Sequence, residues 1–255
     1  MATDEAILEA VGQGSALPTL RLYAWNPACL SLGYSQPISD VDQDLLRQSG
    51  WDIVRRPTGG RAILHTDELT YAVITPLNEP RVSGGILESY RRLAQALLEA
   101  LHLLGLPAQT AHKYPIAPGS QPDGAVCFEV PSNYEITANG KKIIGSAQAR
   151  RIYGVLQHGS LPLTGNLTRI TRVLRFSDEA ARDEAAQRLL EHATTLETLL
   201  KTSISWEEAA AAFATAFERC LDLRLEAGHL GGMELKRAAE LVQQKYSNPT
   251  WTERT

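Results

Sequence analysis

Three arginines, two adjacent glycines and a histidine lie within one short segment, RRPTGGRAILH, from Arg55 to His65. Glycine lets a ligand approach the backbone closely and leaves amide N–H groups free for an anion or a carbonyl oxygen, and arginine adds fixed positive charge. The segment therefore predicts a site for an anionic or carbonyl-bearing group. Standing alone, it could equally be a surface hairpin with solvated arginines.

A cysteine supplies the first candidate nucleophile. Cys127 lies in AVCFEVPSNYE, after a loop rich in proline and glycine, where a thiol is more open to chemistry than in a core. We expect Cys29 and Cys220 to be inert packing residues. The three cysteines form neither a CxxC pair nor an even disulfide framework, which favours a reducing compartment.

A lysine and a second histidine follow in GKKIIGSAQARR and LQHGSLPL. Lys142 precedes an apolar pair and could point inward, and Lys141 suits the solvated face of the same strand. Most lysines are solvated, and a lone histidine such as His158 is usually a satisfied core or rim residue. Neither Lys142 nor His158 indicates catalysis when it is considered alone.

Strand patterns dominate the first part of the chain, and one helix interrupts them. Apolar residues at three- and four-residue intervals predict an amphipathic helix from Gly84 to Leu104. Asn139-Gly140 suits a tight hairpin turn between two alternating segments, and a further antiparallel strand follows from Gly154 to Leu163. Short β-favouring runs are expected at Leu20 to Ala24, Cys29 to Gly33, Trp51 to Val54 and Tyr71 to Ile74.

Helical periodicity dominates after residue 175. The predicted helices span Asp178 to Leu200, Trp206 to Leu221 and Met233 to Tyr246, and the second begins with a capping box. Because strands and helices do not alternate regularly, we predict an α+β fold rather than a doubly wound parallel sheet. We expect a catalytic domain over residues 1–175 and a C-terminal helical segment, residues 176–255, packed on it.

Composition excludes several classes of function. The 255-residue chain has a formal net charge of -4, which argues against wholesale binding of nucleic acid, and no apolar run long enough to span a membrane. Its N-terminal segment lacks the features of a signal peptide, so we expect a cytoplasmic protein. Motifs of α/β-hydrolases, zincins, P-loop proteins and zinc ribbons are absent, and no metal is implied.

Four ordered segments together, RRPTGGRAILH, Cys127 before PSNYE, GKKIIGSAQ and QHGS, resemble the biotin/lipoate A/B protein ligase superfamily. YAWNPACLSLGYSQ, CFEVPSNYE and the closing KYSNPTW resemble in particular the cysteine-dependent octanoyltransferases that act on the glycine cleavage H protein. The likeness spans nearly the whole chain. These families usually have a further strand before the segment that matches residues 1–10, and the resemblance leaves open whether this chain lacks it or has been shortened.

The resemblance implies a central mixed sheet with flanking helices, an acyl tunnel, and a cysteine that forms an acyl thioester beside a lysine, namely Cys127 and Lys142. It requires no cofactor. An acyl carrier protein would donate octanoyl, and the H protein or a lipoyl domain would accept it. The substrate-binding residues implied are Arg56, Gly59, Gly60, Arg61, His65, Gly145, Ser146, Ala147, His158 and Gly159.

Both partner classes are typically acidic, so we expect a docking patch of arginines, consisting of Arg55, Arg56, Arg61, Arg150 and Arg151. Three alternatives stay open. The chain could be an ATP-dependent lipoate-protein ligase, in which Cys127 would have no evident role. It could be an amidotransferase that moves octanoyl between lipoyl proteins, or a non-catalytic module that binds an acyl group or a carrier.

Overall fold

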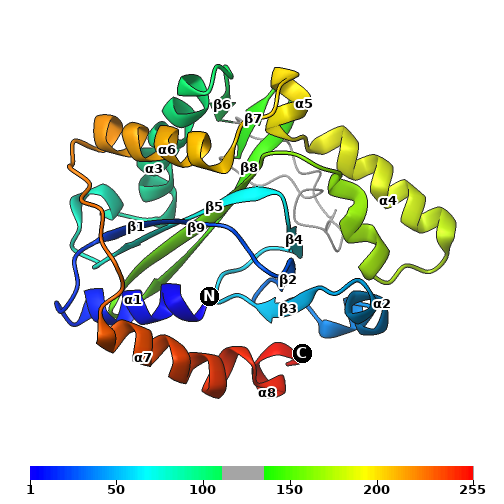
Figure 1. The fold of residues 1–255 in the computed structure, drawn as a ribbon, viewed down its shortest axis with the longest axis horizontal. Helices are drawn as coiled ribbons and strands as arrows, with labels where there is room; N and C mark the ends of the chain where they lie inside the picture. The colour runs from blue at the N-terminus through cyan, green and yellow to red at the C-terminus, as the bar shows by residue number, and fades with distance from the viewer. Residues whose placement is uncertain (111–134, 255) are drawn as a thin grey trace.

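A computed structural model of the chain describes residues 1–110 and 135–254. Within these ranges the chain forms a six-stranded antiparallel sheet, a separate three-stranded sheet, and helices on both faces of the larger sheet (Figure 1). The predicted α+β class is confirmed. No helix in the described part of the chain is both long and apolar enough to cross a membrane.

The large sheet has the strand order β1-β5-β9-β8-β7-β6, and the small sheet has the order β3-β2-β4. In the small sheet β2 pairs parallel to β3 and antiparallel to β4, so the mixed pairing predicted for the central sheet occurs here. The strands are β1 (Thr19–Tyr23), β2 (Cys29–Leu32), β3 (Asp52–Arg55), β4 (Ile63–His65), β5 (Glu68–Thr75), β6 (Gln109–Thr110), β7 (Ile136–Ala138), β8 (Lys141–Arg151) and β9 (Gly154–Pro162).

Helices close the two faces of the large sheet, α3 and α6 on one side and α1 with α7 on the other (Figure 1). The α-helices are α1 (Ala2–Gly12), α2 (Gln43–Gln48), α3 (Ile86–Leu103), α4 (Glu179–His192), α5 (Leu196–Leu200), α6 (Trp206–Leu221), α7 (Gly232–Leu241) and α8 (Pro249–Thr252). Single turns and short helices of other types are η1 (Ile38–Asp40), η2 (Pro80–Val82), η4 (Leu167–Val173) and the π-helix η5 (Val242–Tyr246).

Strand β5 shows why the large sheet is covered on both faces. All of its residues are buried, and successive side chains of a strand point to opposite faces. Tyr71 and Val73 belong to the core shared with α3 and α6, whereas Ala72 and Ile74 pack against Ile7 of α1. A strand that is apolar on both faces must be covered on both, which fixes the layered arrangement.

The predicted strand runs are confirmed, as is the helix predicted from Gly84 to Leu104. The hairpin is confirmed too, because Asn139 and Gly140 have φ angles of 50° and 77°. A single helix from Asp178 to Leu200 was the wrong expectation. Residues 193–195 leave the helix and pair with Lys142 through a parallel bridge, with the Thr194 N–H donating to the Lys142 carbonyl at 3.1 Å.

Candidate active site

A cavity of about 630 Å³ lies where the small sheet meets strands β8 and β9. Its volume is within the range of sites for small molecules in proteins. Every described residue that we predicted from the sequence to bind substrate borders it, namely Arg56, Gly59, Gly60, Arg61, His65, Gly145, Ser146, Ala147, His158 and Gly159. Lys142 borders it as well. Cys127 lies outside the described residues.

The glycine hairpin of the RRPTGGR segment is held by the arginine that precedes it. Arg56 is only 3% exposed, and its guanidinium donates to the carbonyl oxygens of Ser31, Gly59 and Arg61 at 2.9, 2.9 and 2.7 Å. A Cβ on Gly33 would lie 1.8 Å from the carbonyl oxygen of Gly60. The glycines therefore allow the hairpin to lie against the end of β2, and Arg56 fixes it there.

The preceding arginine has a different set of partners. Arg55 is fully buried, and its guanidinium donates to carbonyl oxygens of residues 33, 34 and 36 and of residues 251, 252 and 254. The indole Nε1 of Trp251 donates in return to the Arg55 carbonyl at 2.9 Å. Arg55 thus joins the C-terminal helix α8 to the loop that follows β2, next to the cavity.

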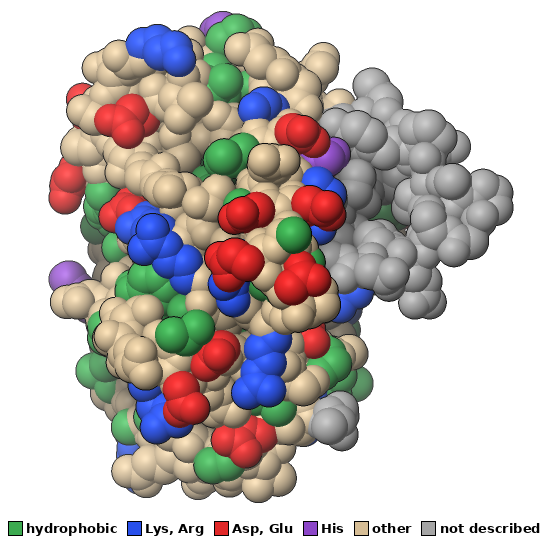
Figure 2. Space-filling model, turned by 90° about the vertical axis from the view of Figure 1, so that its right-hand side faces the viewer, with side chains coloured by type: hydrophobic (Ala, Val, Ile, Leu, Met, Phe, Trp, Pro, Cys, Tyr) green, Lys and Arg blue, Asp and Glu red, His purple; other side chains and the backbone are tan. Residues whose placement is uncertain are grey.

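The prediction that Arg55 and Arg56 belong to an exposed docking patch is therefore wrong. Their guanidinium groups are surrounded by backbone carbonyls because the planar fork of donors matches several acceptors at once. Of the other three arginines in the predicted patch, Arg61 borders the cavity, Arg150 donates to the Val82 carbonyl, and Arg151 is exposed. Figure 2 shows the face that carries α4, where several acidic side chains gather near the centre and basic side chains lie around them.

Lys142 forms a buried ion pair. Its Nζ lies 2.5 Å from Oε1 of Glu135, and the two side chains are 5% and 6% exposed. Lys141 points to the other side of β8, and its Nζ donates to the Leu190 carbonyl at 2.5 Å. The inward orientation expected for Lys142 is confirmed. Sequence reasoning missed Glu135, although it is the last residue of the PSNYE segment.

His158 is an uncharged histidine in the cavity wall. Its Nε2 lies 2.6 Å from Thr58 Oγ1, and its buried Nδ1 has no hydrogen-bond partner among residues 1–110 and 135–254. Burial lowers the pKa of His158 from its usual 6.5 to about 3, despite the opposing effect of Asp4. The imidazole is therefore neutral at physiological pH, and it can orient a bound group but is a weak base.

The strands β8 and β9 approach each other closely beneath the cavity. Ser146 is in register with Gly159, and a Cβ on Gly159 would lie 2.4 Å from the Gly145 carbonyl oxygen. The Ser146 hydroxyl lies 2.6 Å from the phenolic oxygen of Tyr71. Glycine at position 159 therefore permits the close pairing that forms this part of the floor.

His65 is the centre of a second polar cluster. Its Nε2 lies 2.7 Å from Ser31 Oγ, its Nδ1 lies 2.5 Å from Glu68 Oε1, and its ring stacks on the Trp25 indole at 4.3 Å. Sequence reasoning selected His65 but missed its three partners. Ser31 and Trp25 belong to the YAWNPACLSLGYSQ segment, which was used only for its overall likeness to a family.

The two described cysteines are poor nucleophiles. Burial raises the pKa of the Cys29 thiol to about 12, and burial with Glu99 nearby raises the pKa of Cys220. Because the thiolate is the reactive form, both thiols are held in the unreactive state at neutral pH. These directions agree with the packing role expected for both residues.

The chain matches the lipoyl protein ligase A/B catalytic domain family over residues 1–218, that is, from α1 through most of α6. It belongs to this family, as the four ordered motifs predicted. The family match extends past residue 175, and the division of the chain at that point stays a prediction.

Within this family, the chain is similar over its full length to curated proteins named octanoyltransferase LipM. The chain is 41% identical to octanoyltransferase LipM of Symbiobacterium thermophilum, covering 100% of this chain and 93% of that protein. It is 40% identical to octanoyltransferase LipM of Kyrpidia tusciae, with the same coverage. Among solved structures, lipoate-protein ligase A bound with ATP is similar at a TM-score of 0.78 and 26% identity, covering 99% of this chain and 92% of that one.

Proposed function

We propose that this protein is an octanoyltransferase, which moves octanoyl from an acyl carrier protein thioester to a lysine of a lipoyl-carrying protein. The observation that carries the proposal is the full-length identity of about 40% to proteins named octanoyltransferase LipM, combined with a cavity bordered by all the described residues of the predicted site. The acceptor is the glycine cleavage H protein or a lipoyl domain.

Cys127 is the proposed nucleophile. Its thiolate attacks the carrier thioester, the C–S bond to the carrier breaks, and the acyl group is held on the enzyme as a new thioester. An ordinary thiol, with a pKa of about 8.5, needs a nearby cation or base to react at neutral pH. Lys142 is the proposed cation, because the buried pair with Glu135 holds its side chain in the wall of the cavity.

The glycine-rich walls bind the acyl group and its carbonyl in this proposal. Gly59, Gly60 and Arg61 form one wall, and residues 145–147 on β8 form the other. Backbone amides and the neutral His158 can donate to the oxygen that becomes negative in the tetrahedral intermediate. Such donors contribute most where water is excluded, and His158 is only 5% exposed.

Intact-protein mass after incubation with octanoyl-acyl carrier protein, without ATP, tests the proposal. We expect one octanoyl adduct on the unmodified chain, none on Cys127→Ala, and discharge of the adduct to added H protein. Cys220→Ala is the matched control and should load normally.

Two alternatives give different results in the same assay. The likeness to lipoate-protein ligase A favours an ATP-dependent ligase, for which acylation of the H protein would require free octanoate and ATP and would survive Cys127→Ala. An amidotransferase would load from an octanoylated lipoyl protein and not from the carrier thioester. If no donor gives an adduct on this chain or acylation of the H protein, the result would favour the non-catalytic module.

A further inference from the structure

Three side chains form a continuous hydrogen-bonded row in the wall of the cavity. Ser31 Oγ lies 2.7 Å from His65 Nε2, and His65 Nδ1 lies 2.5 Å from Glu68 Oε1. All three residues are buried, with Ser31 and His65 bordering the cavity and Glu68 behind them. The mechanism above assigns no proton transfer to this row.

Donor-only groups at both ends determine which atoms carry the protons. The indole Nε1 of Trp25 can only donate, and it donates to Thr70 Oγ1 at 2.9 Å, so the Thr70 hydroxyl donates onward to Glu68 Oε1. At the other end Arg56 Nη1, which also can only donate, lies 3.3 Å from Ser31 Oγ. With His65 in its neutral form, the row therefore runs in one direction, from Arg56 through Ser31 and His65 to Glu68.

This direction leaves His65 with an available lone pair. Its Nδ1–H donates to Glu68, so in the neutral ring Nε2 is the acceptor and receives the Ser31 hydroxyl. A proton given to Ser31 from the cavity can displace the serine's own proton onto Nε2, and Glu68 then stabilises the imidazolium. The row is arranged to remove one proton from the cavity.

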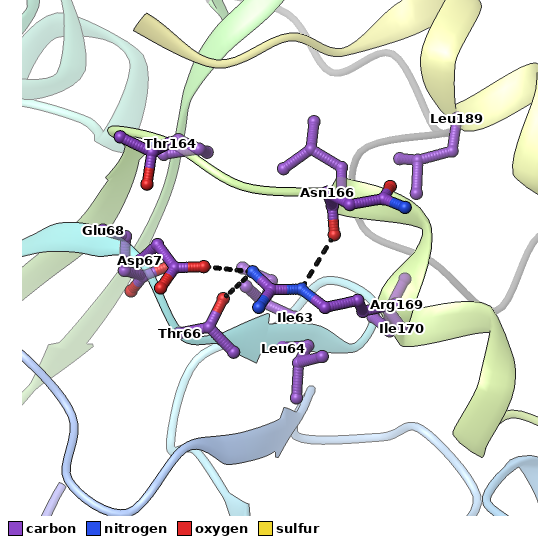
Figure 3. Close-up of a pocket in the computed structure, with 12 residues that line it drawn as sticks. Ile63, Leu64, Thr66, Asp67, Glu68, Thr164, Asn166, Arg169, Ile170 and Leu189 are labelled. Carbon is purple, nitrogen blue, oxygen red and sulfur yellow. Dashed lines mark hydrogen bonds and ion pairs between the residues drawn. The ribbon is translucent and has the colours of Figure 1, made fainter. Parts of the chain in front are cut away.

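The surrounding strands hold the row in place. His65 ends β4 and Glu68 begins β5, and the turn between them is fastened by Arg169 of η4, whose guanidinium bonds Asp67 and, at 2.8 Å, the Thr66 hydroxyl (Figure 3). The Trp25 ring covers one face of His65 at an interplanar angle of 13°. The imidazole therefore cannot turn away from either partner.

The other polar side chains that define the cavity are less suited to take up a proton. Lys142 is paired with Glu135, and a paired ammonium has no lone pair to accept a proton. Burial lowers the pKa of His158 to about 3, too low to hold a proton taken from an amine. Glu135 can act as a base only at the expense of its pair with Lys142.

We propose that Ser31, His65 and Glu68 form the proton relay that deprotonates the acceptor lysine, an inference that rests on the proposed function. A lysine with a pKa near 10.4 arrives as an ammonium ion, which cannot attack. One of its protons passes to Ser31 as the Ser31 proton passes to His65. The free amine then forms the C–N bond, the C–S bond to the enzyme breaks, the thiolate takes the second proton, and the relay releases its proton to solvent.

Ser31 is a relay group in this proposal and not a second nucleophile. Its hydroxyl is bonded to His65 Nε2, and its oxygen already accepts from Arg56. His65 and Glu68 act through Ser31 and do not contact the substrate lysine in this proposal. His65 receives the serine proton, and Glu68 holds the His65 ring in place.

The two half-reactions, followed by intact mass, test the relay. We expect Ser31→Ala and Glu68→Gln to load from octanoyl-acyl carrier protein at the unmodified rate but to discharge to the H-protein lysine about 100-fold more slowly, a typical contribution of general acid–base catalysis. Discharge to hydroxylamine, which is uncharged at neutral pH, should be unchanged. Ser49→Ala, on an exposed serine at the end of α2, is the control and should behave as the unmodified chain.

Equal slowing with both amines would overturn the relay, because it would indicate damage to the pocket. A selective loss with Glu135→Gln but not with Ser31→Ala would assign the proton to Glu135 and overturn it too. If Ser31→Ala fails to fold, Glu68→Gln alone is compared with Glu135→Gln and should show the same selectivity. If the unmodified chain loads only with octanoate and ATP, the proposed function has failed, and the two amines are compared from that donor.

Discussion

The two sheets that meet at the cavity hold buried positive charge in different ways. On the small sheet, the guanidinium groups of Arg55 and Arg56 bond backbone carbonyls from segments far apart in the sequence. On the large sheet, Lys142 of β8 forms a buried ion pair with the carboxylate of Glu135, just before β7. The first arrangement joins segments of the backbone, whereas the second places one ammonium group in the cavity wall.

This difference indicates which of the buried cationic residues around the cavity support the structure and which can take part in a reaction. A guanidinium among carbonyls is fixed and has no proton to exchange at any ordinary pH. An ammonium group beside a carboxylate can change its contacts during a reaction. We infer that the arginines of the small sheet hold the shape of the cavity and that Lys142 takes part in the reaction.

The largest expected effect of a single change is that of Arg55→Met. It would leave carbonyls of two segments buried without donors, at a cost of about 1–3 kcal/mol for each that finds no other partner. We expect the free energy of unfolding, measured with urea, to fall by about 4 kcal/mol. Arg47→Met, on an arginine whose side chain is 74% exposed, is the control and should leave the midpoint nearly unchanged. Similar midpoints for the two variants would refute the structural role of Arg55.

The Lys142–Glu135 pair should behave differently. Lys142→Met alone leaves a buried carboxylate without its cation, and we expect a loss of about 3 kcal/mol in the free energy of unfolding. Replacing both members, Lys142→Met with Glu135→Leu, should restore most of that loss, because an apolar pair can substitute for a buried ion pair. Loading of octanoyl should remain absent in both variants. Recovery of loading in the double variant would show that the pair is only structural.

The buried, uncharged His158 in the cavity wall should make the free energy of unfolding depend on pH. Because its pKa is about 3 in the folded protein and 6.5 when unfolded, only the unfolded state takes up this proton between those values. The contribution of His158 to the free energy of unfolding should therefore be fully present above pH 6.5. Below pH 6.5 the free energy of unfolding should fall by about 1.4 kcal/mol per pH unit, a total loss of about 2 kcal/mol at pH 5. His158→Gln should remove this slope, and His102→Gln, on an exposed residue of α3, should not. Equal slopes in all three proteins would contradict the low pKa.

Local patterns predicted the strands, the main helices and the Asn139-Gly140 turn, because each depends on residues close in the sequence. The inward orientation of Lys142 was predictable for the same reason, since side chains alternate along a strand. The ordered motifs also predicted part of the set of residues that border the cavity, including Lys142.

The features that could not be predicted from the sequence depend on contacts between residues far apart in the chain. Arg55 has the appearance of a surface arginine until residues 251–254, almost 200 positions later, surround it with carbonyls. The helix predicted through residue 200 is interrupted because residues 193 and 194 pair with β8. The partners of His65 come from β2, β5 and the segment after β1, and no spacing in one strand indicates that they converge.

The smallest expected effect lies behind the relay, at the pair of Arg169 and Asp67 (Figure 3). This pair is partly exposed, at 28% and 43%, so water screens it and Arg169→Ala should lower the free energy of unfolding by only about 1 kcal/mol. The pair of Arg169 and Asp67 should also affect the relay, because the turn that it fastens joins His65 to Glu68. We therefore expect discharge to the lysine acceptor to slow several-fold while discharge to hydroxylamine is unchanged. A change in stability without that selectivity would show that β4 and β5 hold the relay without help from η4.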